Sequence, residues 1–293
     1  MKDDLRVLSG VDSVASRIRK PFPWETLFIT LGLIFLAFLF VLPLYWMLVS
    51  SVRPQSEIFA HGFDLTPSSV TFENYKRLFT EIPFERWYRN TVVQSLSFAG
   101  VSVIACTMGG FALAKYKFPF RNVIFISILT AQMIPFHLLI VSLFVMIIDL
   151  GLIDSLWGAI LPLAAHPIGI FFMRQYLVSL DDELLNAARV DGANELQVFY
   201  SIVLPHVRPA IATLLILFTL EYWNNLLWPL IVFRNGEHFP LSVGISTLVS
   251  TYRAQYDLVM AASVLTTLPI VILFFLLRRQ FMEGIAATGT GMK

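Results

Sequence analysis

The stretch ELLNAARVDGANELQVFYSIVLP, residues 183–205, places a polar segment between long runs of Leu, Ile, Phe and Val. Asp181, just before it, is a good N-cap for a helix with an acidic first turn, and Gly192 is suited to end that helix in a left-handed conformation. Asn194, followed by a glutamine three residues later, is suited to cap a second helix. Pro205 is expected to end the second helix near a membrane surface. The pattern therefore predicts two short helices joined by a fixed elbow.

Two interpretations of this segment remain open on physical grounds. Leu184, Leu185 and Ala188 form a narrow apolar stripe, and the small Ala187 beside them lets another surface approach closely. The segment is then either a docking surface for another protein or an amphipathic loop that rests against the protein's own helices. The spacing of its residues does not require a partner.

The composition is that of an integral membrane protein. The 293-residue chain is 57% hydrophobic and only 14% charged, whereas a soluble domain carries about 25% charged residues. The net charge of +1 gives no basic field for nucleic acid, so we expect no nucleic acid partner. One cysteine, Cys106, and five scattered histidines predict neither an intrachain disulfide framework nor a metal site.

Six apolar runs are long enough to cross a bilayer, whose ~30 Å hydrocarbon core needs about 20 residues of helix. We therefore expect an all-α integral membrane protein with six transmembrane helices. The predicted spans are residues 26–52, 91–114, 122–148, 155–173, 209–233 and 258–277.

The predicted organisation is a tail of residues 1–25, a transmembrane domain of residues 26–278 with a loop at 179–208, and a tail of residues 279–293. An even number of spans places both tails on one side of the membrane. If that side is the cytoplasm, the inner segments hold about two-thirds of the 21 Lys and Arg, in agreement with the positive-inside rule. The first apolar run is too long for a signal peptide, so we expect no cleavage.

The segment NAARVDGANELQVFYSIVLP resembles the signature loop of binding-protein-dependent ABC importer permeases, which reads E-A-A-x-x-D-G-A before an apolar helix ending in L-P. Asn186 stands where that family usually has Glu. WNNLLWPLIVF, residues 223–233, resembles the fifth-helix segment of the carbohydrate-importing branch, and RRQFMEGIAATGTGMK and FENYKRLF resemble its C-terminal tail and first periplasmic segment. The likeness points to a MalG-like subunit. The positions that match the loop pattern are Ala187, Ala188, Asp191, Gly192, Ala193, Phe199, Leu204 and Pro205.

This resemblance implies a type I ABC importer permease (MetI-like) fold with a cytoplasmic coupling helix, in a bacterial inner membrane. It implies a MalF-like second permease subunit, two ATP-binding cassette subunits and an extracytoplasmic sugar-binding protein as partners, besides the lipid bilayer. The chain would then form half of the pathway for a sugar or oligosaccharide and couple to the ATPase through residues 181–205. The implied ATPase-coupling residues are Leu185, Asn186, Ala187, Ala188, Asp191, Gly192 and Ala193.

The chain lacks the G-x-x-x-x-G-K-[ST] phosphate loop, and the terminal TGTGMK has neither its spacing nor its flanking strand and helix. We therefore expect a transport subunit and not an enzyme, with no catalytic residue and no metal or cofactor bound by this chain. ATP and Mg would be bound by the partner ATPase.

Glu221 lies near the middle of the fifth predicted span, where an ionisable group is costly and commonly functional. On a continuous helix, Glu221, Asn224, Asn225 and Trp228 share one face, and Tyr222 adjoins them. Amides and a carboxylate bind sugar hydroxyls, and an indole stacks on a pyranose, so these five residues are candidates for the substrate pathway. The alternative is that they join helices through interhelical hydrogen bonds.

Residues 234–257 form an outer loop on this topology. The resemblance implies that the loop reaches toward the binding protein, and Gly236 and Gly244 would allow it to bend; the alternative is a lid packed on neighbouring helices. His166, like His137, is expected to pack between helices, and Gly110, with the glycine before it, to permit a close helix crossing. Asp154 is expected to be solvated.

Other functions remain possible on the sequence alone. The same importer class could carry glycerol-phosphate, polyamines or peptides. An ion-coupled secondary transporter, with Glu221 as its proton site, would need inverted repeats and more intramembrane charges. A membrane enzyme would need converging catalytic groups, and a purely structural subunit would need no coupling loop.

Overall fold

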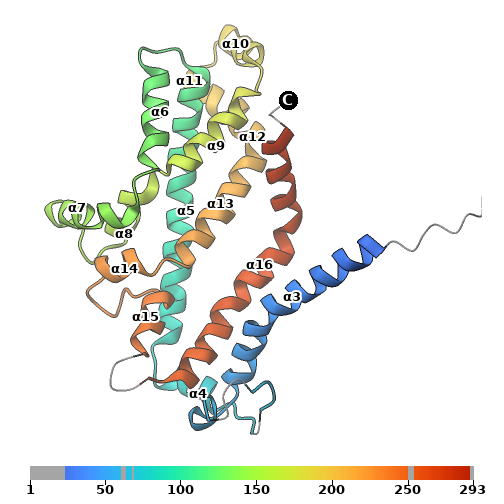
Figure 1. Ribbon diagram of the computed structural model, residues 1–293. Coiled ribbons are helices and arrows are strands. Elements are labelled where there is room, and N and C mark those ends of the chain that lie inside the picture. Colours follow the sequence, from blue (N-terminus) through green and yellow to red (C-terminus); the bar gives the residue numbers. More distant parts are fainter. Residues whose placement is uncertain (1–23, 61–63, 68, 250–253, 291–293) are drawn as a thin grey trace, which may run out of the picture.

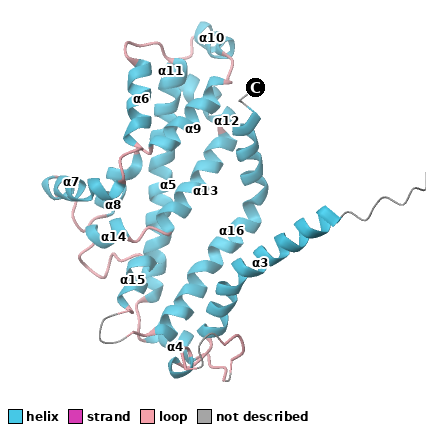
Figure 2. Cartoon of the chain, in the orientation of Figure 1, coloured by secondary structure: helices cyan, strands magenta, loops and turns pink. Residues whose placement is uncertain are grey.

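The computed structural model describes residues 24–60, 64–67, 69–249 and 254–290. Within these ranges the chain is helical (Figure 2), apart from loops and one isolated antiparallel bridge between Val249 and Ala254. The all-α fold class is confirmed. Most of the predicted N-terminal tail and the last three residues lie outside the described residues.

The long helices at the two ends of the chain are α3 (Trp24–Ser51) and α16 (Tyr256–Thr290). Between them come η1 (Gln55–Glu57), α4 (Glu73–Thr80), α5 (Phe84–Lys115), α6 (Arg121–Ala131), α7 (Phe136–Asp149), α8 (Leu156–Ala164), α9 (Pro167–Val178), α10 (Asp182–Val190), α11 (Glu195–Val198), η2 (Phe199–Val203), α12 (Leu204–His206), α13 (Arg208–Trp223), α14 (Leu227–Val232) and α15 (Leu241–Thr247).

Three stretches of helix are long and apolar enough to cross a membrane unbroken: Thr26–Ser51 in α3, all of α5, and Tyr256–Phe275 in α16. Three further candidates are bent pairs. α6 and α7 meet at 104°, α8 and α9 at 52°, and the helical stretch Glu195–His206 meets α13 at 76°. The predicted six crossings are reached when each bent pair is counted as one.

Proline chemistry explains two of the breaks. Pro135 precedes α7 and Pro167 begins α9, and proline both lacks an N–H and disfavours helix in the residue before it. Pro205, in contrast, does not end a helix as predicted, because it lies inside α12 and the chain turns only at Val207. The wider π-helical turn of η2 directly before α12 leaves room for the proline ring.

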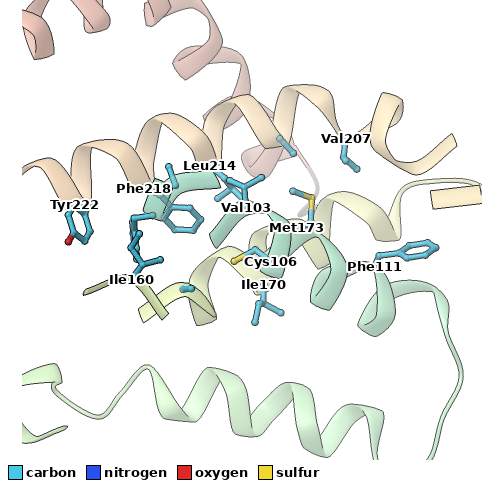
Figure 3. Close-up of a cluster of buried hydrophobic side chains, with 14 of the residues drawn as sticks. Val103, Cys106, Phe111, Ile160, Ile170, Met173, Val207, Leu214, Phe218 and Tyr222 are labelled. Carbon is cyan, nitrogen blue, oxygen red and sulfur yellow. The ribbon is translucent and has the colours of Figure 1, made fainter. Parts of the chain in front are cut away.

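The core is built around α5, which packs against α8, α9 and α13 (Figure 1). Figure 3 shows this cluster, in which Cys106 of α5, Met173 of α9 and Phe218 of α13 are buried together. A Cβ on Gly110 would lie 2.8 Å from the Cβ of Met173, and one on Gly169 would lie 2.6 Å from the Sγ of Cys106. The predicted close crossing at Gly110 is confirmed.

A second cluster lies at the opposite end of the molecule from α10, where α4, α15 and α16 surround the start of α5. Trp87 of α5 and Leu241 of α15 belong to it. A Cβ on Gly244 would lie 2.1 Å from Cδ2 of Trp87. Gly244 is therefore a contact point inside α15, and the prediction that it lets the loop bend is wrong.

Candidate functional site

The polar segment forms the predicted helix, elbow and helix. The Asp181 side chain accepts a hydrogen bond from the amide of Glu183 at 2.9 Å and caps α10. Gly192 has φ +87°, the left-handed conformation predicted for the elbow. Asn194 and Gln197 form the predicted capping box at the start of α11, with reciprocal bonds of 2.9 and 2.7 Å. Local chemistry thus fixes the shape of this loop.

The end of α5 holds the loop through a nearly buried lysine. The Lys115 ammonium donates to the carbonyl of Leu180 at 2.5 Å and to Oδ1 of Asp182 at 2.6 Å, and only 5% of its side chain is exposed. The hydrogen bond from Lys115, and then its positive charge, lower the pKa of the Asp182 carboxyl below its usual value. α5 and α10 are therefore joined by a charge-assisted bond, which is stronger than a neutral one.

A second set of bonds holds the far side of the elbow. The hydroxyl of Tyr116 donates to Oε2 of Glu195, and Nε of Arg189 donates to Oε1 of the same carboxylate at 2.8 Å. The bond from Arg189, followed by that from Tyr116, lowers the pKa of the Glu195 carboxyl. We call these five residues, Lys115, Tyr116, Asp182, Arg189 and Glu195, the loop clasp.

The predicted coupling residues divide into two groups. Leu185 is 1% exposed and packs in the protein's own core, with Ala188 and Ala193 half-buried against it. The exposed members are Asn186, whose Oδ1 accepts a 2.9 Å bond from Arg189, and Ala187, Asp191 and Gly192.

Large apolar side chains also project from this loop. Val190, directly before the elbow, is 88% exposed, and Leu196 and Tyr200 are 69% and 64% exposed. The sequence analysis did not predict that these three side chains are exposed. An apolar residue between the charged Arg189 and Asp191 could have indicated Val190. Exposed apolar groups gathered on a loop beside charged residues are typical of a surface that another protein covers.

The single helical face predicted for the pathway residues is wrong. α13 ends at Trp223, residues 224–226 separate it from α14, and both asparagines bond to helix ends. Asn224 Nδ2 donates to the carbonyl of Leu220 at 2.8 Å, and Asn225 Oδ1 accepts from the amide of Trp228 at 3.3 Å. These bonds satisfy backbone groups that a helix end leaves free, which makes the break stable.

Two of the five pathway candidates are enclosed. Trp228 is 0% exposed and its indole Nε1 donates to the carbonyl of Ala159 at 3.1 Å. Tyr222 is 2% exposed, and its hydroxyl donates to Oε1 of Gln94 at 3.4 Å. Of the others, Asn225 is half-buried, whereas Glu221 and Asn224 are exposed.

Glu221 is paired with a histidine from another helix. Its Oε1 lies 3.2 Å from Nε2 of His166, which stands at the bend between α8 and α9, and 48% of the Glu221 side chain stays exposed. The His166 ring packs against Phe218, with ring centroids 5.1 Å apart. The packing role predicted for His166 is confirmed, but its bond to Glu221, 55 residues away, was not predicted.

The loop after α14 is fastened to its neighbours. Asp154 Oδ1 accepts from the amides of Arg234 and Asn235 at 3.1 and 3.3 Å and lies 3.2 Å from Nδ1 of His238. Burial raises the pKa of the Asp154 carboxyl, but these bonds together outweigh burial and lower it. The prediction that Asp154 is merely solvated is wrong.

Side chains of α5 also bind the loop between α14 and α15. Asn90 Nδ2 donates to the carbonyl of Glu237 at 2.7 Å, and Gln94 Nε2 donates to that of His238 at 2.8 Å. Thr91 Oγ1 accepts from the amide of Leu241 at 2.7 Å. Up to α15 the loop is therefore fastened to its neighbours by hydrogen bonds, although residues 234–238 are exposed, and residues 250–253 lie outside the described residues.

In the parts of the chain that the structure describes, no three His, Cys, Asp or Glu side chains gather closely enough to hold a metal ion. Among those residues, the two histidines that meet a carboxylate each form a pair, His166 with Glu221 and His238 with Asp154.

Comparison with known proteins gives a consistent result. The family model described as "Binding-protein-dependent transport system inner membrane component" matches residues 103–285. The arabinooligosaccharides transport system permease protein AraQ of Halalkalibacterium halodurans is 40% identical over 274 residues, which cover 92% of this chain and 98% of the relative.

Two relatives of lower sequence identity are named for the transport of other solutes. The lactose transport system permease protein LacG of Rhizobium radiobacter is 30% identical over 248 residues, covering 85% of this chain and 90% of the relative. The sn-glycerol-3-phosphate transport system permease protein UgpE of Escherichia coli is 30% identical over 271 residues, covering 90% and 96%.

One solved structure is similar throughout. It is a chain of a bacterial ABC transporter involved in the import of the acidic polysaccharide alginate, with a TM-score of 0.77 and 24% sequence identity. The likeness covers 89% of this chain and 100% of that one. At this identity it shows the fold alone.

Proposed function

The chain belongs to the inner-membrane components of binding-protein-dependent transport systems, and from this premise we propose that it forms half of the pathway of an ATP-driven importer for a sugar or oligosaccharide. Proteins of this family are multi-pass inner-membrane transport subunits. The observation that carries the proposal is the capped helix-elbow-helix loop, clasped to α5 and bearing exposed apolar side chains. The names of AraQ and LacG support a sugar as the solute.

The loop is the proposed contact with the ATPase. Asn186, Ala187, Asp191 and Gly192 are exposed on it, and the apolar Val190 among them would be covered by a partner. Leu185, Ala188 and Ala193 anchor the same helix and elbow from inside. Because the sequence has no phosphate loop, ATP and Mg would be bound by two ATP-binding cassette subunits.

A MalF-like subunit and an extracytoplasmic binding protein complete the proposed importer. No residue in the most apolar stretch of α3 is buried, and α3 leaves the other helices at a slant (Figure 1), so much of its surface is open to a second permease subunit or to lipid. The C-terminal end of α16 lies at the same end of the molecule as α10 (Figure 1), which supports a cytoplasmic side shared by the loop and the C-terminal end.

The proposed mechanism passes movement from the loop to the spans. Closure of the ATPase dimer would displace α10, and the Lys115 bonds would carry the displacement to α5. α5 has 32 residues, or about 48 Å of helix, so it reaches the far side of the membrane. Alternating access then requires that inward-facing and outward-facing states differ in their contacts with the ATPase and the solute.

We place the solute beside Glu221 and Asn224, which are exposed where α13 ends. Glu221 is oriented by His166, so its carboxylate is held ready to accept hydrogen bonds from sugar hydroxyls. The other three candidates hold the backbone around Glu221 and Asn224 in place through their own hydrogen bonds. They are Tyr222, Asn225 and Trp228.

The Glu221 carboxylate also helps to choose between a neutral sugar, an anionic solute and an ion-coupled transporter. It would repel a phosphate or a uronic acid, so a neutral sugar fits better than glycerol-phosphate or an acidic polysaccharide. An ion-coupled transporter would use the Glu221–His166 pair as a proton site, but such a protein has no need of a clasped loop that presents apolar side chains.

Affinity purification from the native membrane, followed by mass spectrometry, tests the proposal. We expect an ATPase, a second permease subunit and a binding protein to co-purify with the wild-type chain. The ligand of that binding protein would identify the solute. Val190→Asp should lose the ATPase and keep the second permease. Val70→Asp, an equally polar change at a 60% exposed valine in the segment between α3 and α4, should keep both. A wild-type chain that recovers no ATPase in mild detergent would contradict the proposal.

A further inference from the structure

Two adjoining cavities lie where the start of α5 meets α4 and α16, at the end of the molecule opposite α10. One has a volume of about 370 Å³ and is lined by Glu85, Arg86 and Arg89, among others. The second, of about 330 Å³, is an apolar groove whose walls include Leu268. Phe79 and Glu85 line both cavities, so the polar and the apolar cavity adjoin, and we call the two together the hollow.

The hollow spans the boundary between membrane and water. Leu265, Leu268 and Ile272 of the groove belong to the apolar stretch Tyr256–Phe275, which is long enough to cross the membrane. Arg89 directly precedes the uncharged part of α5, and Tyr88 beside it lines the groove. Arginine and tyrosine at such a point are typical anchors at the membrane interface. The charged cavity therefore lies at head-group level and the groove points into the hydrocarbon.

The charges in the polar cavity are only partly satisfied by the protein. Arg86 pairs with Glu237 at 2.5 Å. Glu85 and Arg89 stand four residues apart on α5, a spacing at which ion pairs form, yet neither makes a hydrogen bond or ion pair with any residue that the structure describes. Glu85 and Arg89 are both exposed, and the described residues leave this anion and cation unpaired at the same cavity beside an apolar groove.

We propose that this hollow binds an aminophospholipid, with the chemistry of phosphatidylethanolamine. The phosphate would lie against Arg89 with Arg86 beside it, the ammonium against Glu85, and one acyl chain along Leu265, Leu268 and Ile272. Arginine is suited to a phosphate because its fork of donors matches the phosphate oxygens. The lipid would join α5 to α16 on the side away from the coupling loop. This site does not depend on which solute the importer carries.

Lipid retention by the complete, purified complex tests the proposal. After delipidation in mild detergent, native mass spectrometry would measure the binding of added dioleoyl-phosphatidylethanolamine, dioleoyl-phosphatidylglycerol and phosphoethanolamine. We expect the first lipid to be held most tightly, the second less because it has no amine for Glu85, and the chainless head group least. Arg89→Gln should lower retention of the first lipid about tenfold, the value of one charged hydrogen bond.

Two further variants separate head group from chain. Glu85→Gln should reduce the preference for phosphatidylethanolamine over phosphatidylglycerol, because it removes the acceptor for the ammonium. Leu268→Trp should fill the groove and lower retention of both lipids. The matched controls are Val271→Trp, on α16 but outside the lining of both cavities, and Lys76→Gln, at a 70% exposed cation of α4. Both controls should behave like the wild type.

Several results would overturn the proposal. Equal retention by the wild type and Arg89→Gln would exclude the phosphate contact, and equal binding of the two lipids by the wild type would exclude the ammonium contact. If Arg89→Gln left lipid retention unchanged but weakened attachment of the extracytoplasmic binding protein, the cavity would be a protein contact and not a lipid site.

Discussion

The ammonium of Lys115, at the end of α5, lies 2.6 Å from Oδ1 of Asp182, in the first turn of α10. The two residues are 67 positions apart in the chain, and Lys115 bonds to the carbonyl of Leu180 as well. This contact joins a long membrane-crossing helix to the loop that the proposal assigns to the ATPase. Movement of the loop therefore cannot occur without either moving α5 or breaking a charge-assisted bond.

Lys115→Met should loosen this connection. The change leaves the buried carbonyl of Leu180 without its donor, at a cost of about 1–3 kcal/mol in the free energy of unfolding. We expect transport to fall more than ATP hydrolysis, because the ATPase would still dock on the exposed part of the loop. Transport and hydrolysis measured together in proteoliposomes check this, and an equal fall in both would contradict it.

Glu195→Gln should weaken the loop clasp in a way that depends on pH. The bonds from Arg189 and Tyr116 lower the pKa of Glu195 in the folded protein, whereas an unfolded Glu titrates near ~4.3. The carboxylate therefore adds stability above about pH 4.3, and this contribution is lost as the pH falls through the lower folded pKa. Melting temperatures of the wild type and the variant should differ at pH 7 and converge in acid; a constant difference would contradict the prediction.

Glu221→Gln should lower uptake of a neutral sugar. Glutamine keeps an oxygen for His166 but removes the charge, and loss of a charged hydrogen bond to a hydroxyl lowers affinity about tenfold or more. Rejection of anionic sugars should also relax. Leu230→Ala, at a 47% exposed leucine of α14, is the control. Uptake by the Glu221→Gln importer with unchanged rate and solute range would show that Glu221 lies outside the pathway.

Gly244→Ala should destabilise the protein, because its Cβ would meet the Trp87 ring at 2.1 Å. Overpacking of this kind costs about 1–3 kcal/mol, which should appear as a lower melting temperature in detergent. Gly236→Ala is the matched control in the loop just before α15, since its Cβ would meet nothing nearer than Phe239 at 4.0 Å. Equal melting temperatures for the two variants would contradict the close contact.

Features set by neighbouring residues were predictable from the sequence. The caps at Asp181 and Asn194 and the left-handed Gly192 follow from local hydrogen bonding and backbone sterics, and each is present in the structure. The all-α class followed from the length of the apolar runs, because a continuous apolar run of about 20 residues crosses the bilayer as a helix that satisfies its own backbone groups.

Features that depend on distant contacts were not predictable in this way. The bond between His166 and Glu221 and the one between Lys115 and Asp182 each join residues more than fifty positions apart. The break after Trp223 was also missed, because hydropathy treats Asn224 as one more residue of a span and ignores its bond to a helix end. Apolar runs indicate that a segment is in the membrane but not where its helix bends.

The most direct test of the coupling role is the ratio of solute transported to ATP hydrolysed, measured for a matched pair of variants at the elbow. Gly192 has φ +87°, and nothing lies within 4 Å of a Cβ placed there, so a substitution changes only the backbone preference. Gly192→Asn should keep a ratio close to the wild-type value, because asparagine tolerates the left-handed conformation. Gly192→Val should lower the ratio sharply, because a β-branched residue does not. A Gly192→Val importer with the wild-type ratio would contradict the assignment of this loop as the link to the ATPase.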